Sequence, residues 1–377
     1  MVEPNPSPAT FVTYDEQKQC PLFSTLPAEI RYDIFAYVLT AAPDSTQPID
    51  QEGYCTRPGY ETRHRTWTEL LRTCRRIYME AWFMPFLCSE HAFFMASRNR
   101  SQSRVITVGE MQQWLDLIHQ RHGEVQGGRI RIFAQLWCLE ESRFQGIFKM
   151  QNFNPKTVTI TIRYTDTWFW ERNEPLHIAG AWNRDLILPE SVKNFNMEIE
   201  SIEHRKAEVD YIANEAAEKW YFKRADDCLM VADKSTISVS RWTGSSVLGR
   251  QRWVRDEVRP GQLDYYVATV SWRPSREALD TFPGPNPKLQ VNWQTPPLRN
   301  LGMESLSAYE LQRMNISLDT PAEEALALWE ARIGISDPYS SEEEMDEESD
   351  EQNEGQSDED WDPSDSNDGD EENSDQE

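Results

Sequence analysis

Trp168 and Trp170, together with the nearby His177, are the side chains of this sequence best suited to chemistry. On a strand the two indoles would share one face and could stack on a sugar or a base, with His177 as a general base. Stacking sites of that kind need a basic groove, and the neighbours Asp166 and Glu171 leave no cationic excess. Packing in the core or at a sheet edge is therefore favoured. A carbohydrate- or nucleotide-modifying enzyme remains the alternative.

The other reactive side chains form no recognisable catalytic or metal-binding pattern. Six cysteines never approach the C-x2-C spacing of a zinc site, and six histidines are scattered along the chain. The closest grouping, Cys88 with His91, would need distant partners. Glycine-rich phosphate loops and the G-x-S-x-G elbow of hydrolases are also absent from the sequence. We therefore expect reduced thiols, a non-enzymatic protein, and no catalytic, cofactor-binding or metal-binding residues.

Charge is distributed unevenly along the chain. The 377 residues carry 64 acidic and 38 basic side chains, and 20 of the acids lie in residues 340–377, which contain no Lys or Arg. We expect this acidic tail to be disordered, because it has too little apolar surface to offset the entropy of ordering. Four serines have an acid three residues on, the pattern preferred by acidophilic kinases of the casein-kinase-2 type: Ser340, Ser341, Ser357 and Ser374.

A second charged segment, from Arg57 to Arg104, holds nine Arg, four Glu and no Lys. Arginine forks suit carboxylates and phosphates. Nucleic-acid binding is the less favoured interpretation, because most of these arginines lie on or beside a predicted helix and can pair internally. The acidic tail is instead predicted to contact this arginine surface or a basic partner protein, and a tail that only aids solubility is the alternative.

The first predicted helix begins near Pro27, which suits a first helical turn. Apolar residues at helical spacing form one broad arc: Ile30, Ile34, Phe35, Tyr37, Val38 and Leu39. Arg31 falls within this arc and needs a carboxylate, while Glu80 lies beside the buried stripe of the next predicted helix. We therefore predict an ion pair between Arg31 and Glu80.

Breaker-rich residues 42–66 predict a long loop. A second helix is expected from Trp67 to about Met84, with Pro85 as its stop. Thr107 and Glu110 have the spacing of a capping box, which predicts a third helix ending at Gly123. These helices make up a predicted helical region over residues 22–122, after a disordered N-terminus, 1–21.

Strand patterns dominate residues 127–272. Apolar and polar residues alternate through 157–164, which predicts one buried face and one wet face. Weaker strand patterns cover 130–139, 197–201, 236–241 and 263–272, and an amphipathic helix covers 209–220. The fold class is therefore α+β, with a mixed, largely antiparallel sheet.

The C-terminal part begins with six prolines in residues 273–300, which predict an extended linker. Helices follow in 301–335, the last starting at Thr320-Pro321 and stopping at Gly334. We see no signal peptide and no stretch long enough to span a membrane, so a cytoplasmic or nuclear protein is expected.

Two motifs together resemble a large family of fungal F-box-like proteins. The first is Leu26-Pro27-Ala28-Glu29-Ile30-Arg31; the second runs from Leu70-Leu71-Arg72-Thr73-Cys74-Arg75 through Ala81, with Phe93-Phe94 beyond. The resemblance covers roughly residues 22–96. It implies an F-box-like helical module that docks on a Skp1-type adaptor of a cullin ubiquitin ligase while the body holds a protein substrate.

By that analogy, five residues would face the adaptor: Leu26, Pro27, Ile30, Ile34 and Leu39. True F-box helices lie in one short module, whereas residues 42–66 separate the first two helices here. The same apolar arc could therefore bury against the body in a purely structural role. The leading interpretation is a non-enzymatic protein-interaction protein, with an F-box-like substrate adaptor as the specific role that the resemblance implies. The sequence does not identify its substrate.

Overall fold

The computed structural model describes residues 14–50, 52–102, 105–125, 127–179, 181–184, 186–275, 289–290, 293 and 295–336. The chain divides into two compact units, 1–330 and 331–377, and the fold below is that of the first. The expectations for residues 1–13, for most of the proline-rich linker and for the acidic tail lie outside the described residues. No helix among the described ranges is long and apolar enough to cross a membrane.

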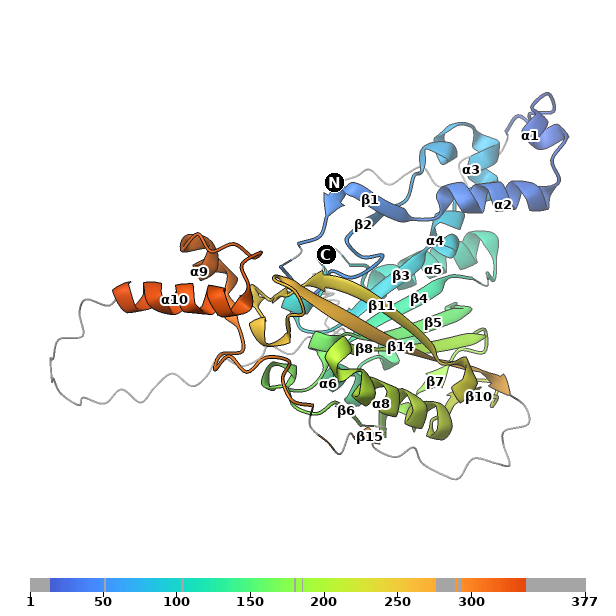
Figure 1. Cartoon of the computed structure of the whole chain (residues 1–377). Coiled ribbons are helices and arrows are strands. Elements are labelled where there is room, and N and C mark those ends of the chain that lie inside the picture. Colours follow the sequence, from blue (N-terminus) through green and yellow to red (C-terminus); the bar gives the residue numbers. More distant parts are fainter. Residues whose placement is uncertain are drawn as a thin grey trace, which may run out of the picture. The chain divides into compact units, whose positions relative to one another are not determined.

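A large mixed sheet forms the centre of the unit (Figure 1). Its parallel part contains, in order, β3 (Glu90–Met95), β4 (Arg129–Ala134), β5 (Thr157–Ile162) and β8 (Asn194–Ile202). The long strand β14 (Gln262–Ser275) then pairs antiparallel with β8, β10 (Leu229–Ala232) and β11 (Ser238–Ser245). The sheet ends with β9 (Phe222–Arg224) and β7 (Ile187–Leu188).

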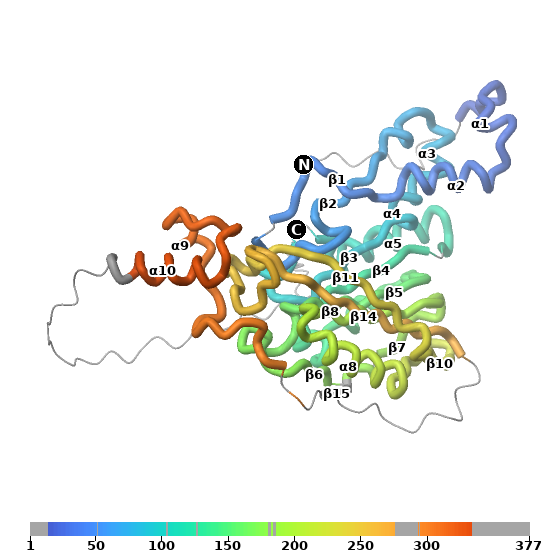
Figure 2. The backbone as a smooth tube through the Cα atoms, in the orientation of Figure 1, coloured from blue at the N-terminus to red at the C-terminus, as the bar shows by residue number. Residues whose placement is uncertain are grey.

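The α+β class is confirmed, whereas the expectation of a largely antiparallel sheet is wrong for the β3–β4–β5–β8 half. Parallel strands need a crossover connection, which is usually helical. Helices α5 (Val108–His122), α6 (Leu136–Glu140) and α7 (Gln145–Phe148) lie between these strands in the chain. Figure 2 follows this path, with β11 and β14 side by side.

The main core lies on the sheet face covered by these helices and by α8 (Lys206–Lys219). Val158, Ile160 and Ile162 of β5 are fully buried there. The opposite face of β5 was expected to be wet, but Thr159 and Thr161 are buried as well. Charged side chains from neighbouring strands explain this difference, since the Thr161 hydroxyl is hydrogen-bonded to both Arg131 and Glu198.

The first predicted helix is present, whereas the second is divided into shorter pieces. The N-terminal helices are α1 (Pro21–Ser24), α2 (Ala28–Leu39), α3 (Arg75–Ala81) and α4 (Met84–Cys88). The helix expected over 67–84 is interrupted: a 3-10 turn at Glu69–Arg72 ends before Cys74, whose backbone is extended and whose Sγ accepts the Ile77 N–H at the start of α3. Pro85 lies in the first turn of α4, where a missing N–H is tolerated, and so does not act as a stop.

The expected loop over 42–66 is partly ordered as a hairpin of β1 (Ala42–Pro48) and β2 (Thr62–Arg65). The register of this pair shifts between Pro43 and Pro48. Proline cannot donate a ladder hydrogen bond, so it is tolerated in strands only at an edge or a bulge. The third helix agrees with its prediction: the Thr107–Glu110 capping box is present, and Gly123 caps α5 with φ of 87°.

Smaller elements complete the described chain. β6 (His177–Ile178) pairs with β15 (Leu289–Gln290), and β12 (Val247–Leu248), β13 (Gln251–Arg252) and β16 (Leu306–Ser307) form a small sheet. Helices α9 (Ala308–Arg313) and α10 (Ala322–Ser336) follow. The buried side of α10 packs with Val254 and Leu311, and the helix continues past Gly334, which was expected to end it.

Candidate functional site

Helix α2 presents an apolar stripe to solvent. Ile30, Ile34 and Val38, four residues apart, are 46%, 38% and 39% exposed, and Tyr37 beside them is 88% exposed. Residues at i and i+4 lie on the same side of a helix. We call Pro27, Ile30, Ile34, Tyr37 and Val38 the α2 outer face.

The opposite side of α2 is anchored in a second core. Phe35 and Leu39 are buried there with Ile77 and Ala81 of α3 and Ile118 of α5. Of the five residues expected to face an adaptor, Pro27, Ile30 and Ile34 are exposed and Leu26 is partly exposed. Leu39 is fully buried, because its place in the helix turns it into this second core rather than along the outer face.

The ion pair predicted between Arg31 and Glu80 is present in the structure. Arg31 Nε lies 2.9 Å from Glu80 Oε2, and Arg31 Nη1 donates to the Leu26 carbonyl at 2.9 Å. Arg76 Nε also donates to Glu80 Oε1, at 3.1 Å. Both guanidiniums lie over the ring of Phe23. These contacts hold the start of α2 and the preceding Leu26 carbonyl against α3.

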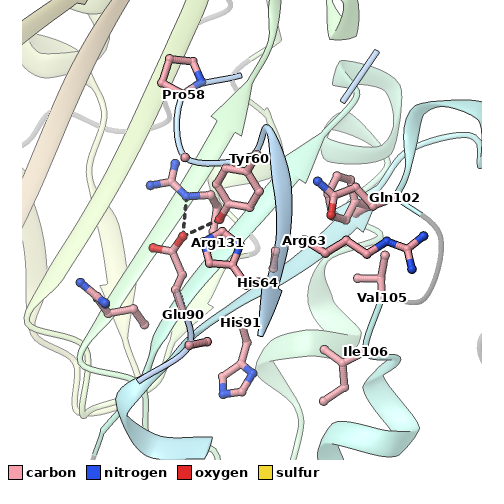
Figure 3. Close-up of a pocket in the computed structure, with 15 residues that line it drawn as sticks. Pro58, Tyr60, Arg63, His64, Glu90, His91, Gln102, Val105, Ile106 and Arg131 are labelled. Carbon is pink, nitrogen blue, oxygen red and sulfur yellow. Dashed lines mark hydrogen bonds and ion pairs between the residues drawn. The ribbon is translucent and has the colours of Figure 1, made fainter. Parts of the chain in front are cut away.

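A second site is a pocket of about 520 Å³ between the β1–β2 hairpin and strands β3 and β4 (Figure 3). We call it the hairpin pocket. The hairpin side contributes Pro58, Gly59, Tyr60, Arg63 and His64, and the strands contribute Glu90, His91, Ala92, Phe94, Arg129 and Arg131, with Ala41, Gln102, Val105 and Ile106 at its edges.

Glu90 is the centre of a hydrogen-bonded network in this pocket. The Tyr60 hydroxyl donates to Glu90 Oε1 at 2.5 Å, and Arg131 Nε donates to the same oxygen at 2.9 Å. Figure 3 shows both side chains converging on Glu90. Burial alone would raise the pKa of Glu90, but the Arg131 charge and these hydrogen bonds outweigh it and lower that pKa. Glu90 is therefore ionised at neutral pH.

The network continues beneath the pocket across the sheet. Arg131 Nη1 donates to Glu198 Oε2 at 2.7 Å, and Arg57 donates to the same carboxylate at 3.1 Å. Burial opposes ionisation of Glu198, yet the charges of Arg57 and Arg131 lower its pKa. The neighbouring Glu200 accepts the Trp242 indole N–H, and there burial prevails and raises the pKa.

Much of the predicted arginine surface is used in internal ion pairs. Among the described residues of this segment, Arg57 pairs with Glu198, Arg65 with Asp44, Arg76 with Glu80, and Arg100 with Glu171. Arg72 and Arg98 are exposed. The segment is thus partly a structural framework, and of its described arginines only Arg63 lines the hairpin pocket.

The aromatic cluster does not form the stacking face that a strand would give it. Phe169 has a left-handed backbone, with φ of 50°, so Trp168 and Trp170 point in different directions. Trp170 is buried against Tyr164 and Trp253, and the Trp168 indole donates to Glu140 at 3.0 Å. His177 lies on β6. None of these three residues lines the hairpin pocket.

The described residues contain no group of three or more His, Cys, Asp or Glu side chains able to hold a metal ion. His91 bonds instead to the Phe86 carbonyl at 2.7 Å, and burial lowers its pKa. All six cysteines are free thiols. The four serines of the kinase pattern, in 340–377, lie outside the described residues.

Sequence reasoning missed Tyr60, Glu90, Arg131 and Glu198 as a group. The available signal was Arg129-Ile130-Arg131-Ile132, where charges alternate with core residues on a strand.

No protein-family model, no curated protein and no solved structure matches this chain.

Proposed function

We propose that this chain is a non-enzymatic protein-interaction protein whose α2 outer face docks a Skp1-type adaptor of a cullin ubiquitin ligase, while its body holds a protein substrate. The observation that carries the proposal is the exposure of Ile30, Ile34, Tyr37 and Val38 along one side of a single helix. Contiguous apolar surface of this kind is characteristic of protein contacts.

The rigid placement of α2 supports the same proposal. Phe35 and Leu39 hold the inner side of the helix, and Arg31 ties its first turn to Glu80. A partner that covers the outer face therefore does not have to order the helix first, which reduces the entropic cost of binding. Apolar side chains at i, i+4 and i+8 are also the pattern by which one helix fills a groove of its partner.

The test is co-purification of the full-length chain with a Skp1-type adaptor and a cullin. An Ile30→Asp/Ile34→Asp variant places two charges in the contact, and we expect at least about a tenfold loss of captured adaptor, because each buried unpaired charge costs well over 1.4 kcal/mol. Ile187→Asp is the matched control, since Ile187 is 57% exposed on β7, outside α2.

Circular dichroism must show that all variants keep the wild-type fold. Undiminished capture by the Ile30→Asp/Ile34→Asp variant would contradict the proposal, as would failure of the wild-type chain to retain any adaptor. Equal loss in the Ile187→Asp control would show that the effect is not specific to the α2 outer face.

A further inference from the structure

We propose that the open edge of β11 binds an extended segment of a basic partner protein, which adds to the sheet as a further strand. This surface lies in the body, separate from the α2 outer face, and the inference does not depend on adaptor docking. Among the described strands, β14 is the only partner of β11. The backbone groups on the other side of β11 therefore have no strand to bond with in the described part of the chain.

The ladder with β14 determines which backbone groups of β11 face outward. Eight consecutive residues pair with β14 in one register, from Ser238 opposite Thr269 to Ser245 opposite Gln262. The Ser246 N–H donates to the Gly261 carbonyl at 2.9 Å, so the neighbouring pair at Ser245 is one without hydrogen bonds of its own. Because the two kinds of pair alternate, four residues direct their N–H and C=O groups away from β14: Val239, Arg241, Thr243 and Ser245.

This edge lacks the usual protection against strand addition. Natural edge strands are shielded by prolines, lysines, bulges or inward-pointing charges. β11 contains no proline or lysine, and its register with β14 contains no bulge. Its one charged side chain, Arg241, pairs with Glu203 at 2.9 Å. Residues 238–241 and 243 are exposed. The edge is thus regular and accessible, as strand addition requires.

β11 is also held firmly on the sheet. The Trp242 indole stacks on Tyr265, with 4.0 Å between the ring centroids and 8° between the planes, and donates to Glu200. A Cβ at Gly244 would lie 2.5 Å from the Trp242 ring, so the glycine allows the indole to lie flat along the strand. An added strand therefore meets a preformed edge, which reduces the entropic cost of binding.

Charge favours a basic partner over a second copy of this chain. The net charge is -26, and residues 1–339 alone carry 44 acids against 38 bases. Two copies would repel each other, whereas a basic segment is attracted. Ser, Thr and Val dominate β11, so recognition comes mainly from the main chain of the added segment. A segment of about eight residues, about 26 Å long when extended, matches its length.

Amide hydrogen exchange of the full-length chain, followed by NMR, tests this inference. The probe is a peptide of about eight residues in which Thr and Val alternate, with a Lys at each end. With a Kd of about 0.5 mM, about 1 mM peptide should slow exchange of the outward amides at 239, 241, 243 and 245 about threefold. The amides of residues 240, 242 and 244 face β14 and should change far less.

A matched pair of variants tests the ladder. Val239→Pro removes one outward N–H at an edge position where proline is tolerated, and it should lose the protection of residues 241 and 243. Val239→Ala keeps the N–H and should retain that protection. Circular dichroism must show the wild-type fold for both variants. Equal protection in the two folded variants would overturn the inference.

The wild-type chain alone provides the remaining tests. A peptide with Glu in place of each Lys should protect the outward amides less strongly. Unchanged exchange with about 1 mM of the Lys peptide would overturn the inference, as would equal protection by both peptides. Sedimentation of the chain without peptide tests the other occupant: a concentration-dependent dimer that protects the same amides would assign the edge to a second copy and overturn the basic partner.

Discussion

Arg31 and Glu80 join two helices through a two-point ion pair. Arg31 Nε lies 2.9 Å from Glu80 Oε2, and Arg31 Nη2 donates to Glu80 Oε1 at 3.3 Å, across 49 positions of sequence. The side chain of Arg31 is 11% exposed and that of Glu80 is 28% exposed. The pair is thus largely removed from water, and Arg76 shares the carboxylate.

Replacement of Glu80 by Ala should destabilise the protein by about 1–2 kcal/mol. Loss of one partner from a fully buried pair costs about 3–5 kcal/mol, and partial exposure reduces that figure. Urea unfolding measures the change. Glu69→Ala is the control, because Glu69 pairs with Arg65 at an exposed site. The free energy of unfolding of this variant should lie within about 0.5 kcal/mol of the wild-type value. Equal stability of the Glu80 and Glu69 variants would refute the expectation.

The two sides of α2 should respond differently to truncation. Phe35→Ala opens a cavity in the second core and should cost about 3–5 kcal/mol. Ile34→Ala, one residue away on the outer face, should cost less than about 1 kcal/mol. Thermal or urea unfolding of both variants checks this contrast. A large loss for Ile34→Ala would mean that the outer face is covered within the monomer.

Acid stability should depend on Arg131. Glu90 and Glu198 have pKa values lowered in the folded state, so the stability they contribute is complete above about pH 4.3, the unfolded value, and is lost as pH falls through the folded pKa. In Arg131→Gln, burial of both carboxyls is no longer offset as strongly, and their pKa values rise. The acid-unfolding midpoint should therefore move to higher pH.

Near-ultraviolet circular dichroism from pH 7 to pH 2 follows that midpoint, and Arg98→Gln serves as the control because Arg98 is exposed outside the network. A midpoint shared by the two variants would argue against the role of the network in acid stability.

The tail should be a substrate for an acidophilic kinase. Incubation of the full-length chain with casein kinase 2 should add phosphate at Ser340, Ser341, Ser357 and Ser374, each of which has an acid three residues on. Peptide mass spectrometry identifies the sites, and Ser349, followed three residues later by Gln352, is the internal control. Preferential phosphate on Ser349 would contradict the prediction.

The sequence predicted local features better than pairings across the chain. The capping box of α5 and the start of α2 depend on a few neighbouring residues, and the structure contains both. The Arg31–Glu80 pair could also be anticipated, because a cation in an apolar arc needs a carboxylate. The hairpin pocket could not, since it depends on Tyr60, Glu90 and Arg131 meeting across three elements. The prediction of one continuous helix over 67–84 was wrong. Its apolar spacing is helical throughout, but the backbone at Cys74 is extended, and a new helix begins after it.

The pairing of β3 with β4 has a consequence for mapping experiments. β3 follows the α2–α4 helices in the chain, yet its ladder partner lies beyond residue 122, and Arg57 of the same N-terminal part reaches Glu198. A fragment ending at 122 would leave Phe93 and Met95 uncovered and an edge open to other chains. If such a fragment failed to bind an adaptor, aggregation would explain the result as well as the loss of a contact. Deletion variants are therefore informative only when they keep residues 14–330 intact.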